Sequence, residues 1–397
     1  MRHMNNNIIY LGWVSFFTDF ASSMVTILVP LYVVYILNEG VDKLGIIIAA
    51  ASFISYFFRI LFGYLSDRFT LVKPLVVSGY LISALTKPML ALTQGYLGVA
   101  IIRGVERVGK AVRSAPKDAL ISAYSETNDS GKTFGFHKTM DIAGELGGAI
   151  CIFLILTWFT LDKDSIRLIF AATLLPGLIA SAIAFFLVKD IPTSIKAKNE
   201  KRKAVINQQD MRLLPLIIIY FTSLFFILSD QFLIIKVKQA GYSVSIIPLF
   251  IIILTLTQTL FSYYSGVITD KIGNHKMLLI AFVFGTLSLL ALWQEYLWLC
   301  FILLGMFTVM SLYAIRAYIS QYAISKAFVY GIFYGGIALT SSLGAIIVGQ
   351  LWKKFGFETV ILFSLSGMII LLLVLAVWIW KKPTYKHEDN AITSLDI

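Results

Sequence analysis

The sequence predicts an all-α membrane protein of twelve transmembrane helices, arranged as two six-helix bundles that resemble each other. Of its 397 residues, 58% are hydrophobic and 14% are charged, which leaves too little polar surface for a soluble domain of this length. Apolar runs of about 20 residues, long enough to cross a hydrocarbon core of about 30 Å, recur along the chain. One long polar segment divides these runs into two sets of six.

Each run is expected to be a helix, because a backbone in lipid must satisfy its own hydrogen bonds and barrel strands would alternate apolar and polar residues. In chain order the runs lie at about 8–37, 44–65, 72–94, 96–114, 134–160, 166–187, 213–238, 244–269, 275–293, 296–317, 327–351 and 358–380. The first run has no small-residue cleavage site, so we expect a retained helix rather than a signal peptide. Cys151 and Cys300 fall within runs, so no disulfide framework is expected.

The polar segment 189–212 predicts a cytoplasmic linker between an N-terminal bundle, residues 1–188, and a C-terminal bundle, residues 213–380, with a tail at 381–397. A net charge of +11 would suggest nucleic acid in a soluble protein, but here Lys and Arg gather at alternate loops. The positive-inside rule then places both termini in the cytoplasm. We expect a multi-pass protein of the inner cytoplasmic membrane, with lipid and not nucleic acid as its surroundings.

The two halves carry related polar positions. Two motifs 203 residues apart follow the second and eighth runs, namely Gly63, Asp67 and Arg68 in the first half and Gly266 and Asp270 in the second. Asp19 and Asp230 stand at comparable depths in the first and seventh runs. Repeated halves are how many secondary transporters are built, with the site between them near the bilayer midplane.

Charge is concentrated between Arg103 and Gly148, where 13 of 46 residues are Asp, Glu, Lys or Arg. On the fourth helix the charges fall within an arc of about 120°, at 100° per residue: Arg103, Glu106, Arg107, Lys110, Arg113 and Lys117. A charge facing lipid near a helix centre costs about 2.5–3.5 kcal/mol, so this stripe is expected to face the bundle interior. Its members Arg103, Glu106, Arg107 and Lys110 form either a structural ion-pair network or part of a cavity.

The fifth helix supplies acids, with Asp141 and Glu145 one turn apart and His137 one turn earlier. They flank Gly144 and Gly148, small residues that allow a neighbouring helix to approach closely. Two such carboxylates in a low dielectric repel each other, so at least one is expected to hold a proton unless a cation of the fourth helix neutralises it. Proton and substrate could then compete for one carboxylate; the alternative is permanent pairing with the cations of the fourth helix.

Four isolated charges complete the candidate set. Asp19 and Glu106 join Asp141 and Glu145 as candidate proton-coupling residues, although helix–helix hydrogen bonding would also explain Asp19. The candidate substrate-binding residues are the cations of the fourth helix with three further positions: Arg103, Arg107, Lys110, Lys87, Asp230 and Lys236.

These motifs resemble the major facilitator superfamily of twelve-helix secondary transporters, and a bacterial branch of it without an assigned substrate. The first motif matches the family's Gly-x-x-x-Asp-Arg-x-Gly-Arg-Arg signature, except that Thr70 and Leu71 replace a Gly and an Arg. The spacing of the helix-5 signature of the family's antiporters is kept by Gly135, Gly144 and Gly148, with Ala149 in place of its final Pro. By resemblance Asp67 is expected to latch one conformational state.

The resemblance and the buried charges together predict a proton-coupled exporter of small organic molecules that rocks one half against the other. Because bases outnumber acids in the first bundle, we expect an anionic or amphipathic solute such as a metabolite, siderophore or drug. The proton gradient is the expected energy source, with no cofactor and no metal, and a monomer is the expected state.

Alternatives remain open on the sequence. An uptake symporter for an organic anion keeps the fold and reverses the direction, which the replacement of the signature Pro by Ala149 favours. A metal-ion carrier would use Asp19, His137 and Asp141, although soft ligands are lacking. A membrane sensor without transport is a weaker reading, because no extra soluble domain is expected. An enzyme is not expected, because no nucleophile–base pair or metal motif stands out.

Overall fold

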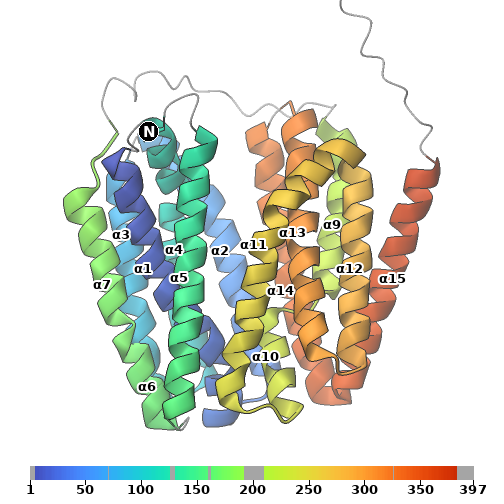
Figure 1. Ribbon diagram of the computed structural model, residues 1–397, viewed down its shortest axis with the longest axis horizontal. Coiled ribbons are helices and arrows are strands. Elements are labelled where there is room, and N and C mark those ends of the chain that lie inside the picture. Colours follow the sequence, from blue (N-terminus) through green and yellow to red (C-terminus); the bar gives the residue numbers. More distant parts are fainter. Residues whose placement is uncertain are drawn as a thin grey trace, which may run out of the picture.

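The computed structural model describes residues 5–69, 71–125, 130–159, 162–191, 210–324 and 326–381. These residues form helices and no strand, so the predicted all-α class is confirmed (Figure 1). The first half contains α1 (Asn6–Leu31) with a π-helical extension (Tyr32–Ile36), α2 (Val41–Phe69), α3 (Lys73–Met89), α4 (Tyr96–Tyr124), α5 (Ser130–Trp158), α6 (Lys163–Ala172) and α7 (Leu174–Ala182) with a second π-helical extension (Ile183–Leu187). The second half contains α9 (Leu214–Phe226), α10 (Asp230–Gln239), α11 (Ile247–Ile272), α12 (Asn274–Trp293), α13 (Leu297–Tyr322), α14 (Lys326–Phe355) and α15 (Phe357–Lys381).

Twelve crossings result when α6 with α7, and α9 with α10, are each taken as one. Eleven of the described segments are long and apolar enough to span a membrane, and α4 is the one crossing outside that set. The charges of α4 explain this, because they lower the hydropathy of a helix that is otherwise long enough. Gly273 between α11 and α12 and Gly356 between α14 and α15 adopt positive φ angles of 86° and 85°, which favour glycine at these tight turns.

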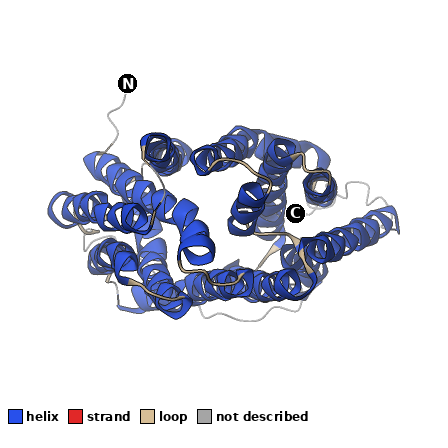
Figure 2. Cartoon of the chain, turned by 90° about the horizontal axis from the view of Figure 1, so that it is seen from below, coloured by secondary structure: helices blue, strands red, loops and turns tan. Residues whose placement is uncertain are grey.

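The helices α1–α7 gather on one side of the molecule and α9–α15 on the other, as the side view and the end-on view both show (Figures 1 and 2). The predicted linker and tail lie mostly outside the described residues, at 192–209 and 382–397. We call the end of the bundle at which α1 begins the N-terminal face, and the other end the opposite face.

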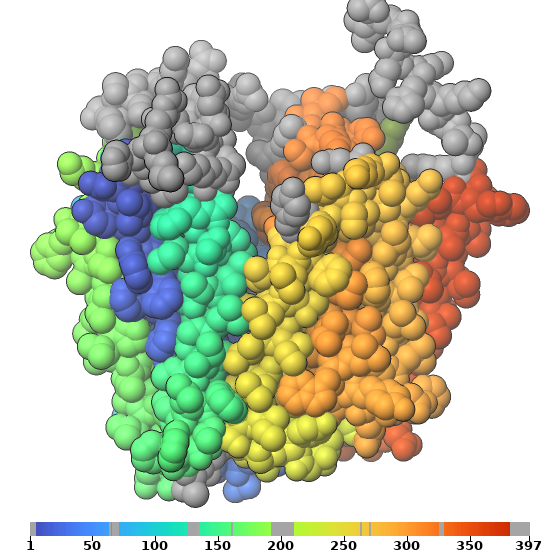
Figure 3. All heavy atoms as spheres, viewed as in Figure 1, coloured from blue at the N-terminus to red at the C-terminus, as the bar shows by residue number. Residues whose placement is uncertain are grey.

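The two halves meet closely at the opposite face. There α2 and α14 approach through glycines, since a Cβ added at Gly349 would lie 3.3 Å from the Cα of Gly45. The hydroxyl of Ser342 donates to the carbonyl oxygen of Ala49 at 2.9 Å. Toward the N-terminal face, at the top of Figure 3, the surface is hollowed between the halves. The molecule is therefore closed at the opposite face.

An ion pair also joins the halves at the opposite face. The Lys353 Nζ of α14 lies 3.0 Å from the Asp42 Oδ2 of α2, and the Asp42 carboxylate is almost fully buried whereas Lys353 is half exposed. Such a partly exposed pair contributes up to about 1 kcal/mol. It therefore favours the state in which this face is closed.

Replacing Asp42 with asparagine is expected to shift the molecule toward separation at the opposite face by up to about fivefold, because it removes this ion pair. Pulsed electron paramagnetic resonance, with spin labels at Leu37 and Phe355, measures the separation. Lys354→Gln is the matched control, since Lys354 forms no ion pair with a described residue. An identical distance distribution in Asp42→Asn and the parent protein would mean that the Asp42–Lys353 ion pair does not favour the closed state.

Candidate functional site

A cavity of about 510 Å³ lies between the two halves, a size typical of small-molecule sites. Residues of α1, α2, α4 and α5 line one wall, and residues of the α9–α10 segment, α11, α13 and α14 line the other. Five charged side chains face it: Asp19, Arg107, Lys110, Glu145 and Asp230. The uncharged polar lining includes Ser22, Ser52, Tyr56, Ser229, Thr255, Gln258, Thr308 and Ser341.

The five cavity charges form no ion pair with one another or with any other residue that the structure describes. Among the ion pairs of the described residues, none includes Asp19, Arg107, Lys110, Glu145 or Asp230. Taking charges out of bulk water is costly unless partners compensate, so unpaired charges at the centre of a membrane-spanning bundle are expected to serve a ligand or an ion. The cavity is the strongest candidate for the binding site.

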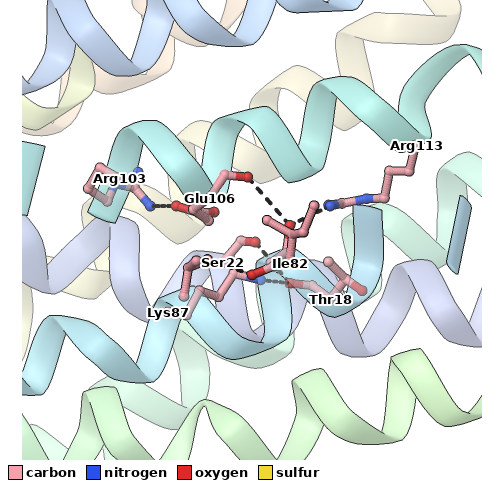
Figure 4. Close-up of polar contacts among 9 residues, drawn as sticks. Thr18, Ser22, Ile82, Lys87, Arg103, Glu106 and Arg113 are labelled. Carbon is pink, nitrogen blue, oxygen red and sulfur yellow. Dashed lines mark hydrogen bonds and ion pairs between the residues drawn. The ribbon is translucent and has the colours of Figure 1, made fainter. Parts of the chain in front are cut away.

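The charges of α4 divide into two groups that sequence alone could not separate. Arg103 and Glu106 pair with each other one turn apart, and both are almost completely buried (Figure 4). Neither lines the cavity, whereas Arg107 and Lys110 do. All four share one side of α4, but the pair lies nearer the opposite face. Arg103 and Glu106 therefore form a structural ion pair, whereas Arg107 and Lys110 line the cavity.

Two further cations fasten helices of the first half together (Figure 4). Lys87 of α3 is buried, and its Nζ donates to the carbonyl oxygen of Thr18 on α1 at 3.3 Å. Arg113 of α4 donates to the hydroxyl of Ser83 at 2.6 Å, and its guanidinium lies over the Tyr80 ring, 4.5 Å from the ring centroid. Lys87, a candidate substrate-binding residue, therefore lies behind the cavity wall rather than in it.

A row of polar side chains runs along α5 toward the cavity. The Nε2 of His137 lies 2.8 Å from the Ser15 hydroxyl of α1, and its Nδ1 lies 3.5 Å from Asp141 Oδ1. Glu145 follows one turn later and reaches the cavity. His137 and Ser15 are buried. The row places ionisable side chains along α5 between its N-terminal end and the cavity.

The glycines of α5 pack against α1 beside this row. A Cβ at Gly144 would meet the carbonyl oxygen of Phe16, and one at Gly148 would meet that of Phe20, so both positions require glycine. Gly135 has no neighbour within 4 Å of an added Cβ. Two members of the predicted glycine ridge thus lie at a close helix contact, and the third does not.

The seventh crossing is broken at the cavity, a feature that the sequence analysis missed. Ile227 and Ser229 are extended, and the hydroxyl of Ser229 accepts a hydrogen bond from the backbone N–H of Gln231, which caps α10. The same hydroxyl donates to Asp230 at 2.9 Å. A serine before an aspartate is a helix N-cap signal, and it was available within the apolar run.

Lys236 lies outside the cavity lining. Its Nζ pairs with Glu295 Oε1 at 2.9 Å and lies 5.0 Å from the centre of the Phe357 ring. The hydrogen bond from Lys236 holds the pKa of Glu295, in the loop between α12 and α13, below its usual range. These contacts tie α10 to its neighbours at the opposite face.

The conformational-latch residues are only partly described. Gly63, Asp67, Arg68 and Asp270 lie outside the residues whose surroundings the structure describes. Gly266 is described, and it lines a second pocket within the C-terminal half. The latch role of the two motifs stays a prediction.

The sequence matches the profile of the Major Facilitator Superfamily over residues 11–257 and 233–395, which together cover almost the whole chain. The chain belongs to the major facilitator superfamily. It is 32% identical over 366 residues to an uncharacterised MFS-type transporter of Methanocaldococcus jannaschii, a match that covers 89% of this chain and 90% of the relative. This membership identifies a membrane transporter rather than an enzyme, as the sequence predicted.

Solved transporter structures share the fold of this superfamily member at low sequence identity. The nucleoside transporter NupG superposes with a TM-score of 0.77 at 16% identity, covering 96% of this chain and 100% of that one. A POT family transporter in complex with a thioalcohol-conjugated peptide gives 0.78 at 11% identity, covering 95% and 96%. A D-xylose–proton symporter gives 0.71 at 17% identity, covering 94% and 96%. These similarities establish the fold.

Proposed function

We propose that this transporter is a proton-coupled exporter of small organic molecules, acting as a monomer in the inner membrane. The observation that carries the proposal is the set of five unpaired charges around one central cavity. Acids and bases that line one cavity can bind a proton or a charged solute in turn. Coupling needs no more than this competition, because each ligand disfavours the other at the shared site.

The N-terminal face is assigned to the cytoplasm in this proposal, because the chain concentrates Lys and Arg in the loops of that side. The cavity then opens to the cytoplasm while the α2–α14 contact closes the outside. Rocking one half against the other would close the first opening and separate the second contact. This alternation carries a bound solute outward and a proton inward.

Asp19 and Glu145 are the proposed proton-binding pair at the cavity, with Asp141 one turn behind Glu145. Asp19 and Glu145 both interact electrostatically with Lys110 of α4. A proton on either acid releases Lys110 to hold an anionic group of the solute, whereas an ionised acid competes for the same cation. The row of His137 and Asp141 offers the proton a route along α5.

The substrate class follows from the wall of the cavity. Arg107 and Lys110 are suited to an anionic group, and Asp230 on the other wall is suited to a donor or a cation. Gln258 donates to the Thr308 hydroxyl at 3.0 Å, so the second wall also offers neutral hydrogen-bonding groups. We therefore propose a small organic solute with an acidic group and further polar groups. The sequence led us to expect an excess of bases around the cavity. Only two of those bases line it, because Arg103 and Lys87 lie behind its wall.

The test begins with a thermal-shift screen of organic acids and metabolites on the purified protein, followed by transport of each hit in proteoliposomes with and without a pH gradient. Substrate-driven proton movement is expected to fall at least tenfold in Asp141→Asn and Glu145→Gln. Glu295→Gln is the matched control, since Glu295 is exposed and distant from the cavity lining. Unaltered proton movement in both α5 variants would remove the basis of the proposed coupling.

Symport is the second candidate. The signature Pro of antiporters is replaced by buried Ala149, and one solved structure with this fold is described as a D-xylose–proton symporter. The same cavity acids would then bind proton and solute together rather than in turn. Net accumulation of the solute in intact cells along the proton gradient would select symport, and its loss from loaded cells would select export.

A further inference from the structure

A second cavity, of about 620 Å³, lies in the C-terminal half toward the N-terminal face. It is formed by α11, α13 and α14, and its polar lining contains one cation among hydroxyl groups: Arg316 with Thr269, Tyr313, Ser320, Tyr330 and Tyr334. A guanidinium carries five N–H donors in a planar fork that matches carboxylate and phosphate. The composition of this pocket is that of an oxyanion site.

Arg316 has no acidic partner among the residues that the structure describes. One guanidinium nitrogen donates to the Tyr334 hydroxyl at 2.8 Å, and the Tyr330 hydroxyl donates to the backbone carbonyl of Arg316 at 3.2 Å. No ion pair of the described residues includes Arg316. Asp118 of α4 interacts electrostatically with Arg316 but is not paired with it. Among the described residues, the guanidinium donates only to Tyr334, which leaves most of its donors available to a ligand.

The equivalent arginine of the first half has its hydrogen-bond donors engaged by partners within the protein. Arg113, 203 residues earlier, donates to Ser83 and to the carbonyl oxygen of Gly79, and it lies against Tyr80. Arg113 is buried, whereas Arg316 is partly accessible from its pocket. The related positions therefore differ, and only the second-half arginine presents its fork to a cavity.

Aromatic residues connect this pocket to the central cavity. Tyr334 of the pocket stacks on Tyr56 of α2 with ring centroids 6.1 Å apart, and Tyr56 lines the central cavity. The guanidinium of Arg59 lies 5.2 Å from the Tyr334 ring centroid, and its Nε is buried without a hydrogen-bond partner. Tyr334 thus lies between two cations, one from each half.

We propose that Arg316 and its tyrosines form an oxyanion-binding vestibule, which holds the acidic group of the solute before the solute enters the central cavity. This assignment rests on the proposed function for its occupant and deepens it by naming a carboxylate or phosphate as the recognised group. Arg316 supplies the charge-assisted hydrogen bonds, and the tyrosine rings supply an apolar and polarisable wall for the rest of the solute. Arg59 adds positive potential from the facing half.

Calorimetric titration of the purified full-length protein with benzoate, and separately with inorganic phosphate, tests the vestibule without transport or a pH gradient. Arg316→Gln is expected to weaken binding of at least one of these anions by at least tenfold. Arg316→Lys keeps the positive charge but loses the planar fork of donors. Its affinity for the anion is expected to lie between those of the parent protein and Arg316→Gln. Thermal unfolding of each variant verifies that it is folded. If Arg316→Gln does not fold, the weaker anion binding expected of Arg316→Lys provides the test.

Lys354→Gln is the matched control, because Lys354 is an exposed cation at the far end of α14 and lines neither cavity. Full binding in Arg316→Gln, or an equal loss in Lys354→Gln, would overturn the vestibule. The same titration in nanodiscs compares phosphatidylglycerol with phosphatidylcholine. If phosphatidylglycerol competes with benzoate at the Arg316 site, the occupant is a lipid headgroup and the solute assignment fails. Because binding is measured at rest, the vestibule can stand even if the proposed export does not.

Discussion

Glu106→Gln is expected to destabilise the protein more than any single change in the cavity. The carboxylate of Glu106 pairs with the Arg103 guanidinium, and both side chains are almost wholly excluded from solvent. Removing one partner leaves the other charge buried and uncompensated, which typically costs about 3–5 kcal/mol. We expect a marked fall in the thermal unfolding temperature in detergent, measured by intrinsic fluorescence, together with a lower yield of monodisperse protein.

The double variant Arg103→Leu with Glu106→Leu tests whether the cost is that of an unpaired charge. Replacing both partners with apolar residues removes the buried charge altogether, so the double variant is expected to be more stable than Glu106→Gln. Arg107→Gln provides the comparison at a cavity-facing position, where the side chain is only partly buried and little stability should be lost. An unfolding temperature for Glu106→Gln equal to that of the parent protein would show that Arg103 finds another counter-charge.

The same pair shows how far sequence reasoning could reach into the site. Helical periodicity correctly puts Arg103, Glu106, Arg107 and Lys110 on one side of α4, since direction depends only on position along the helix. Whether a charge of α4 pairs within its own helix or faces a cavity depends on how deep in the bundle it lies. It also depends on how α1 and α3 pack beside it. Those neighbours come from distant parts of the chain, so the division of the stripe required the structure.

Lys87 and Asp230 illustrate the two kinds of outcome for isolated charges. Both stand alone in apolar runs, and sequence could say only that each needs a polar environment. Lys87 finds a backbone carbonyl of α1, whereas Asp230 stands at a helix break beside the cavity. The overall fold was predictable because hydropathy reveals eleven of the crossings, and α4, which its charges make less apolar, is still long enough to span a membrane.

The neutral part of the cavity was not found from sequence. Thr255, Gln258 and Thr308 are single polar residues in long apolar helices, and such residues also serve as helix–helix hydrogen bonds. The unpaired Arg316 vestibule was equally hidden, although the matching spacing of Arg113 and Arg316 was visible. Internal repeats predict corresponding positions, but the packing around each position decides which one stays accessible.

Gly45→Ala is expected to hinder closure of the opposite face and so change the access of the cavity. A Cβ at Gly45 would lie 2.6 Å from the carbonyl oxygen of Ala345 on α14, a distance that forces the two backbones apart. Overpacking of this kind costs about 1–3 kcal/mol, which corresponds to a shift of about 5- to 150-fold toward separation. The cost is expected to fall on the closed state, which is the state that contains this contact.

The shift can be measured through a single cysteine at Ser341 in the cavity wall, after replacement of Cys151 and Cys300. A membrane-impermeant maleimide applied from the opposite face should label Ser341→Cys faster by that factor when Gly45→Ala is present. Gly331→Ala on α14 is the matched control, since an added Cβ there meets nothing within 4 Å. Because a state that cannot close cannot complete a transport cycle, solute flux should fall as labelling rises. Equal labelling rates in Gly45→Ala and Gly331→Ala would mean that the α2–α14 glycine contact does not control the opposite face.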